Sequence, residues 1–136
     1  MNILVIDGQG GKLGCQMVRY IAEKYPGARL MAVGTNSAAA AAMAKAGAHQ
    51  AAAGENPLIV ACRKADIIIG PIGIVIADSL FGEITPAMAV AVAQSDAVRI
   101  LLPVNRCGNI VAGVQELSLT ALISDAMAKL EGVMQE

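Results

Sequence analysis

The sequence of 136 residues contains little charge, and this scarcity excludes several classes of protein. Charged residues make up 15% of the chain, and 10 Lys and Arg against 11 Asp and Glu give a formal net charge of −1 at pH 7. A chain with so little charge and 56% hydrophobic residues buries a core and is not disordered. Because the basic residues form no cluster, we expect no binding to nucleic acid or to an anionic membrane surface.

The chain also lacks an apolar run long enough to cross a membrane, although its mean hydropathy of +0.60 is high. A transmembrane helix needs about 20 consecutive apolar residues. The richest stretch, residues 67–77, is shorter and contains two glycines and a proline, and residues 87–93 are mostly alanine. We attribute the apolar surplus to buried parallel strands with alanine-rich helices packed on them. The same surplus predicts a homo-oligomer.

Residue patterns of metal sites and redox pairs are absent as well. The three cysteines, Cys15, Cys62 and Cys107, are widely separated, and no pair has the spacing of a zinc or redox motif. No His, Cys and Asp cluster indicates a metal, and no Ser-His-Asp set can form around the single histidine, His49. The first residues show no basic region or cleavage site of a signal peptide, so we expect a reduced, cytoplasmic protein.

Strand-like and helix-like segments alternate along the whole chain, without a linker or a repeat. Apolar runs predict strands, whereas helical spacing of apolar residues, caps and alanine predict helices. The expected strands are residues 2–7, 29–34, 48–53, 66–69 and 98–104, with a further short strand at 109–114. The expected helices are residues 11–24, 38–46, 57–64, 86–94 and 117–133, and residues 74–84 fit neither pattern.

This alternation predicts a single three-layer α/β domain over residues 1–136. We expect a Rossmann-like parallel sheet of about five strands in the order 3-2-1-4-5, and the flavodoxin-like order is the alternative. In both orders the ligand crevice lies at the carboxyl ends of the strands. The residues that directly follow each strand are therefore the candidates for a site.

The segment after the first strand carries the most specific signal, a G-x-x-G-x-x-G pattern between a strand and a helix. Residues without side chains let the backbone turn tightly and approach a phosphate, and the helix N-terminus offers N–H groups to an anion. The pattern predicts a nucleotide or phosphate site, and the alternative is a tight turn without a ligand. It is not a P-loop, because no G-K-[ST] follows. The predicted contacts are Gly8, Gln9, Gly10, Gly11, Lys12, Leu13 and Gly14.

The end of the second strand lacks the acid that an NAD-type site carries there to hold the ribose. Thr35, Asn36 and Ser37 occupy this position instead. Their small polar side chains can hydrogen-bond a ribose or a phosphate, and the alternative is ordinary capping of the next helix. The missing acid weakens the case for NAD, whereas a structural turn does not need one.

The ends of the fourth and fifth strands complete the predicted crevice. The backbone at Gly70, Pro71 and Gly73 suits close approach of a flat ligand, or it forms a plain chain reversal. Asn105 and Arg106 follow the fifth strand, and the arginine can hold a phosphate or a carboxylate.

Two residues are weak candidates for catalysis. Cys107 is a possible nucleophile beside an arginine, and the alternative is a turn with a half-buried thiol. Asp7 either acts as an acid or braces the glycine turn. Asp78 and Glu83 flank a segment that forms a lid or is simply solvated.

Several strings of the chain resemble a family of short bacterial proteins of unknown function. They are residues 3–11 (ILVIDGQGG), 32–37 (AVGTNS), 46–48 (AGA), 54–57 (GENP), 66–79 (DIIIGPIGIVIADS), 82–89 (GEITPAMA) and 103–107 (PVNRC). The resemblance implies a stand-alone cytoplasmic Rossmann-like domain and assigns no catalytic residue. The glycine loop is also distantly similar to that of extended short-chain dehydrogenases. Their Tyr-x-x-x-Lys motif is not matched, because Tyr20 and Lys24 have this spacing inside the first predicted helix.

Three functions stay open on the sequence. The first is a module that binds a nucleotide or dinucleotide, with NAD(P) among the cofactors, and acts as a sensor, carrier or subunit. The second is a small NAD(P)-dependent or thiol-using enzyme whose site a second subunit completes. The third is a protein-interaction module with structural glycine turns. One half of a dinucleotide fold without a substrate domain favours the first function.

Overall fold

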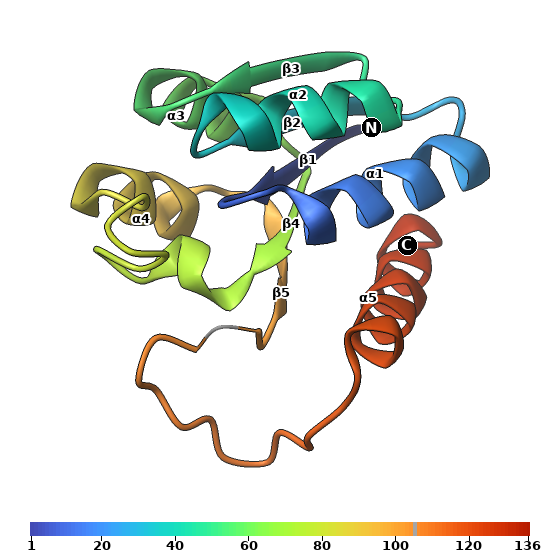
Figure 1. Ribbon diagram of the computed structural model, residues 1–136. Helices are drawn as coiled ribbons and strands as arrows, with labels where there is room; N and C mark the ends of the chain where they lie inside the picture. The colour runs from blue at the N-terminus through green and yellow to red at the C-terminus, as the bar shows by residue number, and fades with distance from the viewer. Residues whose placement is uncertain (105) are drawn as a thin grey trace.

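The computed structural model describes residues 1–104 and 106–136, which form a parallel sheet between two layers of helices (Figure 1). The strands are β1 (Asn2–Asp7), β2 (Arg29–Gly34), β3 (Gln50–Ala53), β4 (Ile67–Pro71) and β5 (Val98–Leu102). The helices are α1 (Lys12–Lys24), α2 (Ser37–Ala46), α3 (Glu55–Lys64), α4 (Pro86–Gln94) and α5 (Leu119–Met134), and a short 3₁₀ helix, η1 (Ile72–Val75), follows β4. The sheet order is β3-β2-β1-β4-β5, which confirms the Rossmann-like prediction over the flavodoxin-like alternative.

Strand β1 lies at the centre of the sheet and pairs on both sides. Its pairing with β2 runs from Asn2 opposite Arg29 to Asp7 opposite Gly34. Its pairing with β4 is shorter and ends where Val5 meets Ile69. The chain moves outward from β1 to β3 on one side and then crosses to β4 and β5 on the other. The junction of β1 and β4 is therefore the switch point at which open α/β sheets bind ligands.

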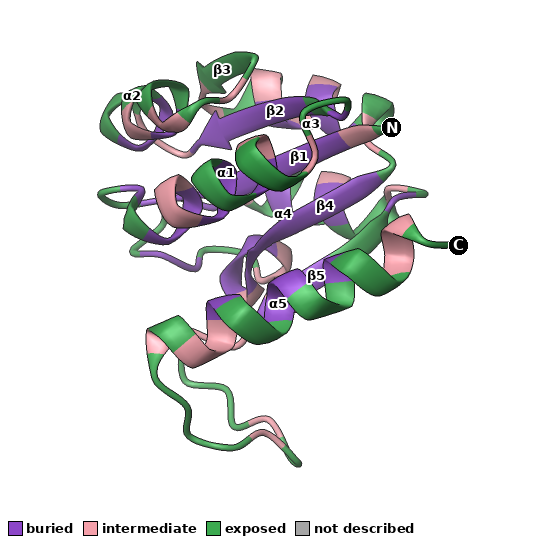
Figure 2. Cartoon of the chain, turned by 90° about the vertical axis from the view of Figure 1, so that its right-hand side faces the viewer, coloured by how far each residue is buried: buried purple, intermediate pink, exposed green. Residues whose placement is uncertain are grey.

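Alternate residues of the central strands enter two separate cores. Ile3 and Val5 of β1 pack with α1 and α5, whereas Leu4 and Ile6 pack with α3 and α4. Successive side chains of a strand point to opposite faces, so a strand covered on both sides reads as a continuous apolar run. Figure 2 shows the result, with buried strands beneath the outward, exposed faces of α1 and α5.

Helices α2 and α4 begin where the sequence supplies a side-chain cap. The side chain of Asn36 accepts a 2.8 Å hydrogen bond from the backbone N–H of Ala39 and caps α2. Thr85 caps α4 in the same way, and Pro86 is the first residue of that helix, as predicted. The α3 helix begins at Glu55 rather than at Pro57.

Other boundaries also differ from the sequence prediction: β3 begins at Gln50 rather than at residue 48, β5 ends at Leu102 rather than at residue 104, and α5 spans Leu119–Met134 rather than residues 117–133. Strand β4 continues through Pro71, whereas the sequence predicted that it ends at Ile69, before Gly70. Proline is tolerated at this position because the pairing with β1 has already stopped at Ile69, so β1 needs no N–H from Pro71. The strand predicted at 109–114 is wrong. This segment has an exposed Ile110 and a left-handed Gly113 (φ 81°), and it lies in the orange loop that extends away from the sheet in Figure 1.

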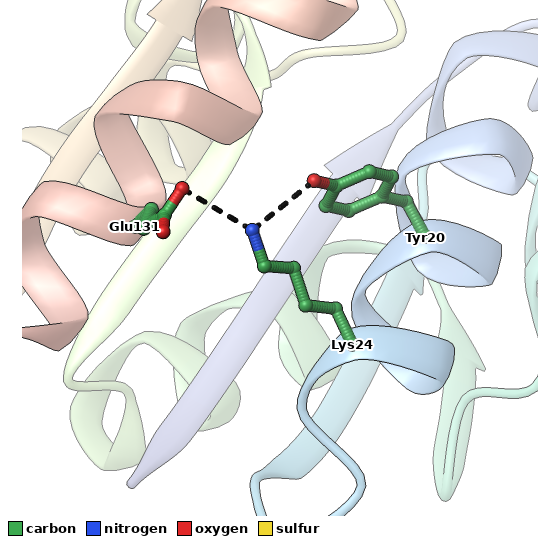
Figure 3. A network of polar contacts seen from close by, with 3 residues as sticks. All are labelled: Tyr20, Lys24 and Glu131. Carbon is green, nitrogen blue, oxygen red and sulfur yellow. Dashed lines mark hydrogen bonds and ion pairs between the residues drawn. The ribbon is translucent and has the colours of Figure 1, made fainter.

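The last helix is tied to the first by a polar contact at the far end of the domain from the β1 loop. The Lys24 ammonium lies 3.2 Å from a carboxylate oxygen of Glu131 and donates a 3.4 Å hydrogen bond to the Tyr20 hydroxyl (Figure 3). The hydrogen bond to Glu131 raises the pKa of Lys24. Lys24 and Glu131 therefore join α1 to α5, and neither Tyr20 nor Lys24 lines the crevice. In the described part of the chain, no helix has the length and apolar character that a membrane crossing requires.

Candidate functional site

A cavity of about 290 Å³ lies at the switch point, where β1 and β4 end. Residues 7–13, which follow β1, form much of its lining. The remaining lining comes from four apolar side chains of other segments: Pro71, Leu80, Val104 and Leu119. A polar backbone loop thus faces an apolar wall across a small space.

Asp7 braces the glycine loop from below. One oxygen of its carboxylate accepts a 2.8 Å hydrogen bond from the N–H of Gly8, and the other accepts a 2.7 Å bond from the N–H of Gly14. Burial raises the pKa of Asp7, the two hydrogen bonds oppose this rise, and the nearby charge of Glu83 adds to it. The carboxylate joins the end of β1 to the first turn of α1 and so braces the glycine turn.

Gly11 and Gly14 are required by packing, whereas Gly10 is not. Gly11 has a left-handed φ of 74°, and a Cβ placed there would lie 2.8 Å from the Cα of Ala39 in α2. A Cβ on Gly14 would lie 2.8 Å from the Cβ of Asp7. Gly10 lines the cavity, has no left-handed φ and would place its Cβ in open space. The fold therefore explains Gly11 and Gly14 but gives no reason for glycine at position 10.

The loop presents unused hydrogen-bond donors at the cavity. The N–H groups of Gly8, Gln9, Gly11 and Gly14 all have acceptors. Within residues 1–104 and 106–136, nothing accepts a hydrogen bond from the N–H of Gly10, Lys12 or Leu13. The Lys12 side chain is exposed and makes no ion pair with the described residues. Together with the positive end of the α1 dipole, these groups favour an anion.

Glu83 has a larger role in the site than the sequence predicted. Its carboxylate accepts hydrogen bonds from the Gln9 N–H (2.8 Å), the Thr35 hydroxyl (2.7 Å) and the Asn36 amide (3.0 Å). Partial burial opposes its ionisation, but the hydrogen bonds from Gln9, Thr35 and Asn36 outweigh burial and lower the pKa of Glu83. An acid from the segment before α4 thus stands at the end of β2, where the strand itself has none.

The predicted residues after β2 lie beside Glu83 rather than in the cavity lining. Asn36 donates a second hydrogen bond, of 2.8 Å, to the carbonyl of Gln9 while its oxygen caps α2. Ser37 is exposed at the first position of α2. The structure therefore uses Thr35 and Asn36 to hold Glu83 and the glycine loop together.

Most of the residues predicted at the ends of the fourth and fifth strands do not line the cavity. Pro71 lines the cavity, but a Cβ on Gly70 would lie 2.5 Å from the carbonyl oxygen of Ile6, and one on Gly73 would lie 3.0 Å from the Ser79 hydroxyl. These two glycines permit close packing and do not face the loop across the crevice.

Arg106 is directed into its own loop. Its guanidinium donates a 3.0 Å hydrogen bond to the carbonyl of Pro103 and lies 3.2 Å from the Glu116 carboxylate. Cys107 is exposed and does not line the cavity. Asn105, the remaining predicted contact, lies outside the described residues.

Sequence reasoning missed the apolar wall, because Leu80, Val104 and Leu119 come from three separate segments and carry no local motif. The single histidine, His49, lies away from the cavity. The Nδ1 of His49 accepts a 3.0 Å hydrogen bond from the N–H of Leu30, near the amino ends of β2 and β3. Among the described residues, no group of three or more His, Cys, Asp or Glu side chains could hold a metal ion.

One family of proteins matches nearly the whole length of the chain. Residues 2–135 match the family described as Domain of unknown function (DUF3842). The chain belongs to this family. A search of the curated proteins found no significant match. The description of this family assigns no activity.

Proposed function

We propose that the chain binds a nucleotide through its phosphate in the switch-point cavity, and that it acts as a sensor, a carrier or the binding subunit of a larger assembly. The observation that carries this proposal is the set of N–H groups of Gly10, Lys12 and Leu13, which lack acceptors in the described chain and lie at the cavity. A phosphate supplies the acceptors that these donors need.

The remaining features of the cavity support the same ligand class. Lys12 supplies a positive charge beside the donors, and glycine at position 10 leaves room for a phosphate to approach the backbone. The apolar wall of Pro71, Leu80, Val104 and Leu119 can pack against a base or another flat ring. The volume of about 290 Å³ lies just below the range of roughly 300–1,000 Å³ that is typical of ligand sites. The ligands to test first are mononucleotides, including the nucleotide halves of NAD(P).

Calorimetric titration with AMP, ATP, nicotinamide mononucleotide, NAD, NADP, FAD, coenzyme A and S-adenosylmethionine tests the proposal. At least one of them should bind the wild type, and Lys12→Ala should weaken that binding by about tenfold, because a charge-assisted contact to phosphate is lost.

Lys45→Ala is the matched control. It removes the same charge from an exposed residue in the last turn of α2, at the opposite edge of the sheet. If no nucleotide binds, or if both lysine variants bind as the wild type does, the proposal is wrong.

The setting of the protein is part of the proposal. The buried Cys62 and the partly exposed Cys15 form no disulfide, which supports a reducing, cytoplasmic location. The α4 helix contains no charged residue, and Val90 is exposed on its surface. A helix that is apolar all round is usually covered, so we propose that the chain associates with a second copy.

A further inference from the structure

A short segment between η1 and α4 lies directly over the first glycine of the loop. We call this segment, residues 78–83, the cover. A Cβ placed on Gly8 would lie 2.8 Å from the Glu83 carboxylate oxygen Oε1, 2.8 Å from the Leu80 Cδ1 and 2.7 Å from the Thr35 hydroxyl. The space above Gly8 is therefore filled by the protein itself, on the side of the loop that faces β2.

The cover is anchored at both of its ends. Glu83 holds the N–H of Gln9 at 2.8 Å and the side chains of Thr35 and Asn36. The Asp78 N–H donates a 2.7 Å hydrogen bond to the carbonyl of Ile84, which closes the segment into a compact loop. Leu80 is buried in the core beneath α3 and α4 and also reaches the switch-point cavity. The cover therefore belongs to the packed structure.

The backbone of the cover is held in an uncommon conformation. Asp78, Leu80 and Phe81 have φ values of 65°, 55° and 57°, in the left-handed region that side chains other than glycine rarely adopt. Such residues persist where the surrounding contacts determine the conformation. Here those contacts are the buried Leu80 side chain and the hydrogen bonds of Glu83.

A dinucleotide bound at a Rossmann-like switch point extends over both sides of the glycine loop. In this chain the β1–β4 side holds the cavity, whereas the β1–β2 side holds Glu83, and the Gln9 N–H is already in use. A second phosphate or ribose would have to displace a carboxylate with three hydrogen bonds. A second phosphate would also meet the negative charge of that carboxylate.

We propose that Glu83 determines the size of the ligand, because it holds the cover over the β2 side of the loop and restricts the site to ligands with one nucleotide unit. The inference rests on the proposed nucleotide function and narrows it from nucleotides in general to mononucleotides. Removal of Glu83 frees the Gln9 N–H and the end of β2, and it lets a dinucleotide occupy both sides.

The test compares the dissociation constants of AMP, nicotinamide mononucleotide and NAD for the wild type and for Glu83→Ala, by calorimetric titration. For the wild type, NAD should bind about tenfold more weakly than the better mononucleotide, because it binds only the fraction of molecules with the cover displaced. In Glu83→Ala this ratio should fall by about tenfold, and the Gln9 amide should exchange faster with solvent.

Two further variants protect the comparison. Glu83→Gln keeps the size of the side chain but presents an N–H₂ group to a donor, so it should change the ratio in the same direction even if the alanine variant is poorly folded. Glu23→Ala removes one negative charge from the exposed surface of α1 and should leave the ratio unchanged.

The outcomes separate the two proposals. Tighter binding of NAD than of either mononucleotide by the wild type, or an unchanged ratio in both Glu83 variants, overturns the role of Glu83 and leaves the nucleotide function standing. Absence of binding by all three ligands to every variant overturns this inference, and absence of binding by the whole calorimetric panel overturns the nucleotide function as well.

Discussion

The Asp7 carboxylate and the Gly14 backbone N–H are joined by a 2.7 Å hydrogen bond between the end of β1 and the first turn of α1. The second oxygen of Asp7 accepts from Gly8, so one side chain fixes both ends of the glycine loop. A Cβ on Gly14 would collide with this carboxylate, lying 3.2 Å from its Oδ2 and 2.8 Å from the Asp7 Cβ. The acid and the glycine are therefore one structural unit.

Asp7→Ala should destabilise the fold by about 1–3 kcal/mol, because two N–H groups beside the carboxylate lose their acceptor. Urea unfolding at neutral pH measures the change. Glu23→Ala, on the exposed surface of α1, should stay within about 0.5 kcal/mol of the wild type. Equal stability of the Asp7 and Glu23 variants would contradict the bracing role.

The stability of the wild type relative to Asp7→Asn should depend on pH. Burial raises the pKa of Asp7 above its ordinary value of 3.8, so the folded state binds the proton more tightly than the unfolded state does. The part of the stability that depends on this proton is thus fully present below pH 3.8 and is lost as pH rises through the folded pKa, whereas the hydrogen bonds from Gly8 and Gly14 remain. Glu83, whose pKa is lowered, titrates in both proteins and acts in the opposite direction. A stability difference that does not change with pH would disprove this assignment.

Alanine at Gly11 and alanine at Gly10 should have different effects on stability. In Gly11→Ala, a residue with a side chain must adopt a left-handed φ, and its methyl group must fit against the backbone of α2. We expect this substitution to lower the free energy of unfolding by about 1–3 kcal/mol. Gly10→Ala adds the same methyl group in open space and should change stability by less than about 1 kcal/mol. Thermal and urea unfolding of both variants measure the difference. Similar losses at both positions would show that the loop is packed differently.

Self-association should depend on the uncharged surface of α4. Light scattering coupled to gel filtration should give a mass of at least two chains for the wild type and a lower mass for Val90→Lys, which places a charge on that surface. Lys45→Ala, on α2, serves as the control and should keep the mass of the wild type. A monomeric wild type would exclude the proposed association.

Local patterns were sufficient for the sheet and most helices. The apolar runs 2–7 and 29–34 coincide with β1 and β2, and Thr85 followed by Pro86 located the start of α4. These signals succeed because a helix cap is formed by neighbouring residues, and because a strand covered on both faces reads as a continuous apolar run. The five-strand order follows from the alternation of such segments.

Features that depend on distant contacts were missed. Nothing near Glu83 in the sequence shows that it will meet Thr35 and Gln9, because the contact exists only after β1, β2 and the cover assemble. The run at 109–114 looked like a strand because it is apolar, but no described strand pairs with it. An apolar pattern shows that burial is favourable, not that a partner is present to provide it.

The central position of β1 has a consequence for the order of folding. Asn2 of β1 pairs with Arg29, whereas Ile3 pairs with Ile67, so the contact with β4 closes a much longer loop than the contact with β2. Since loop closure costs more entropy as loops lengthen, the β1–β2 half assembles more readily. The switch-point cavity lies at the later junction and is absent from partly assembled chains. A ligand in that cavity therefore stabilises the finished protein alone and draws folding to completion.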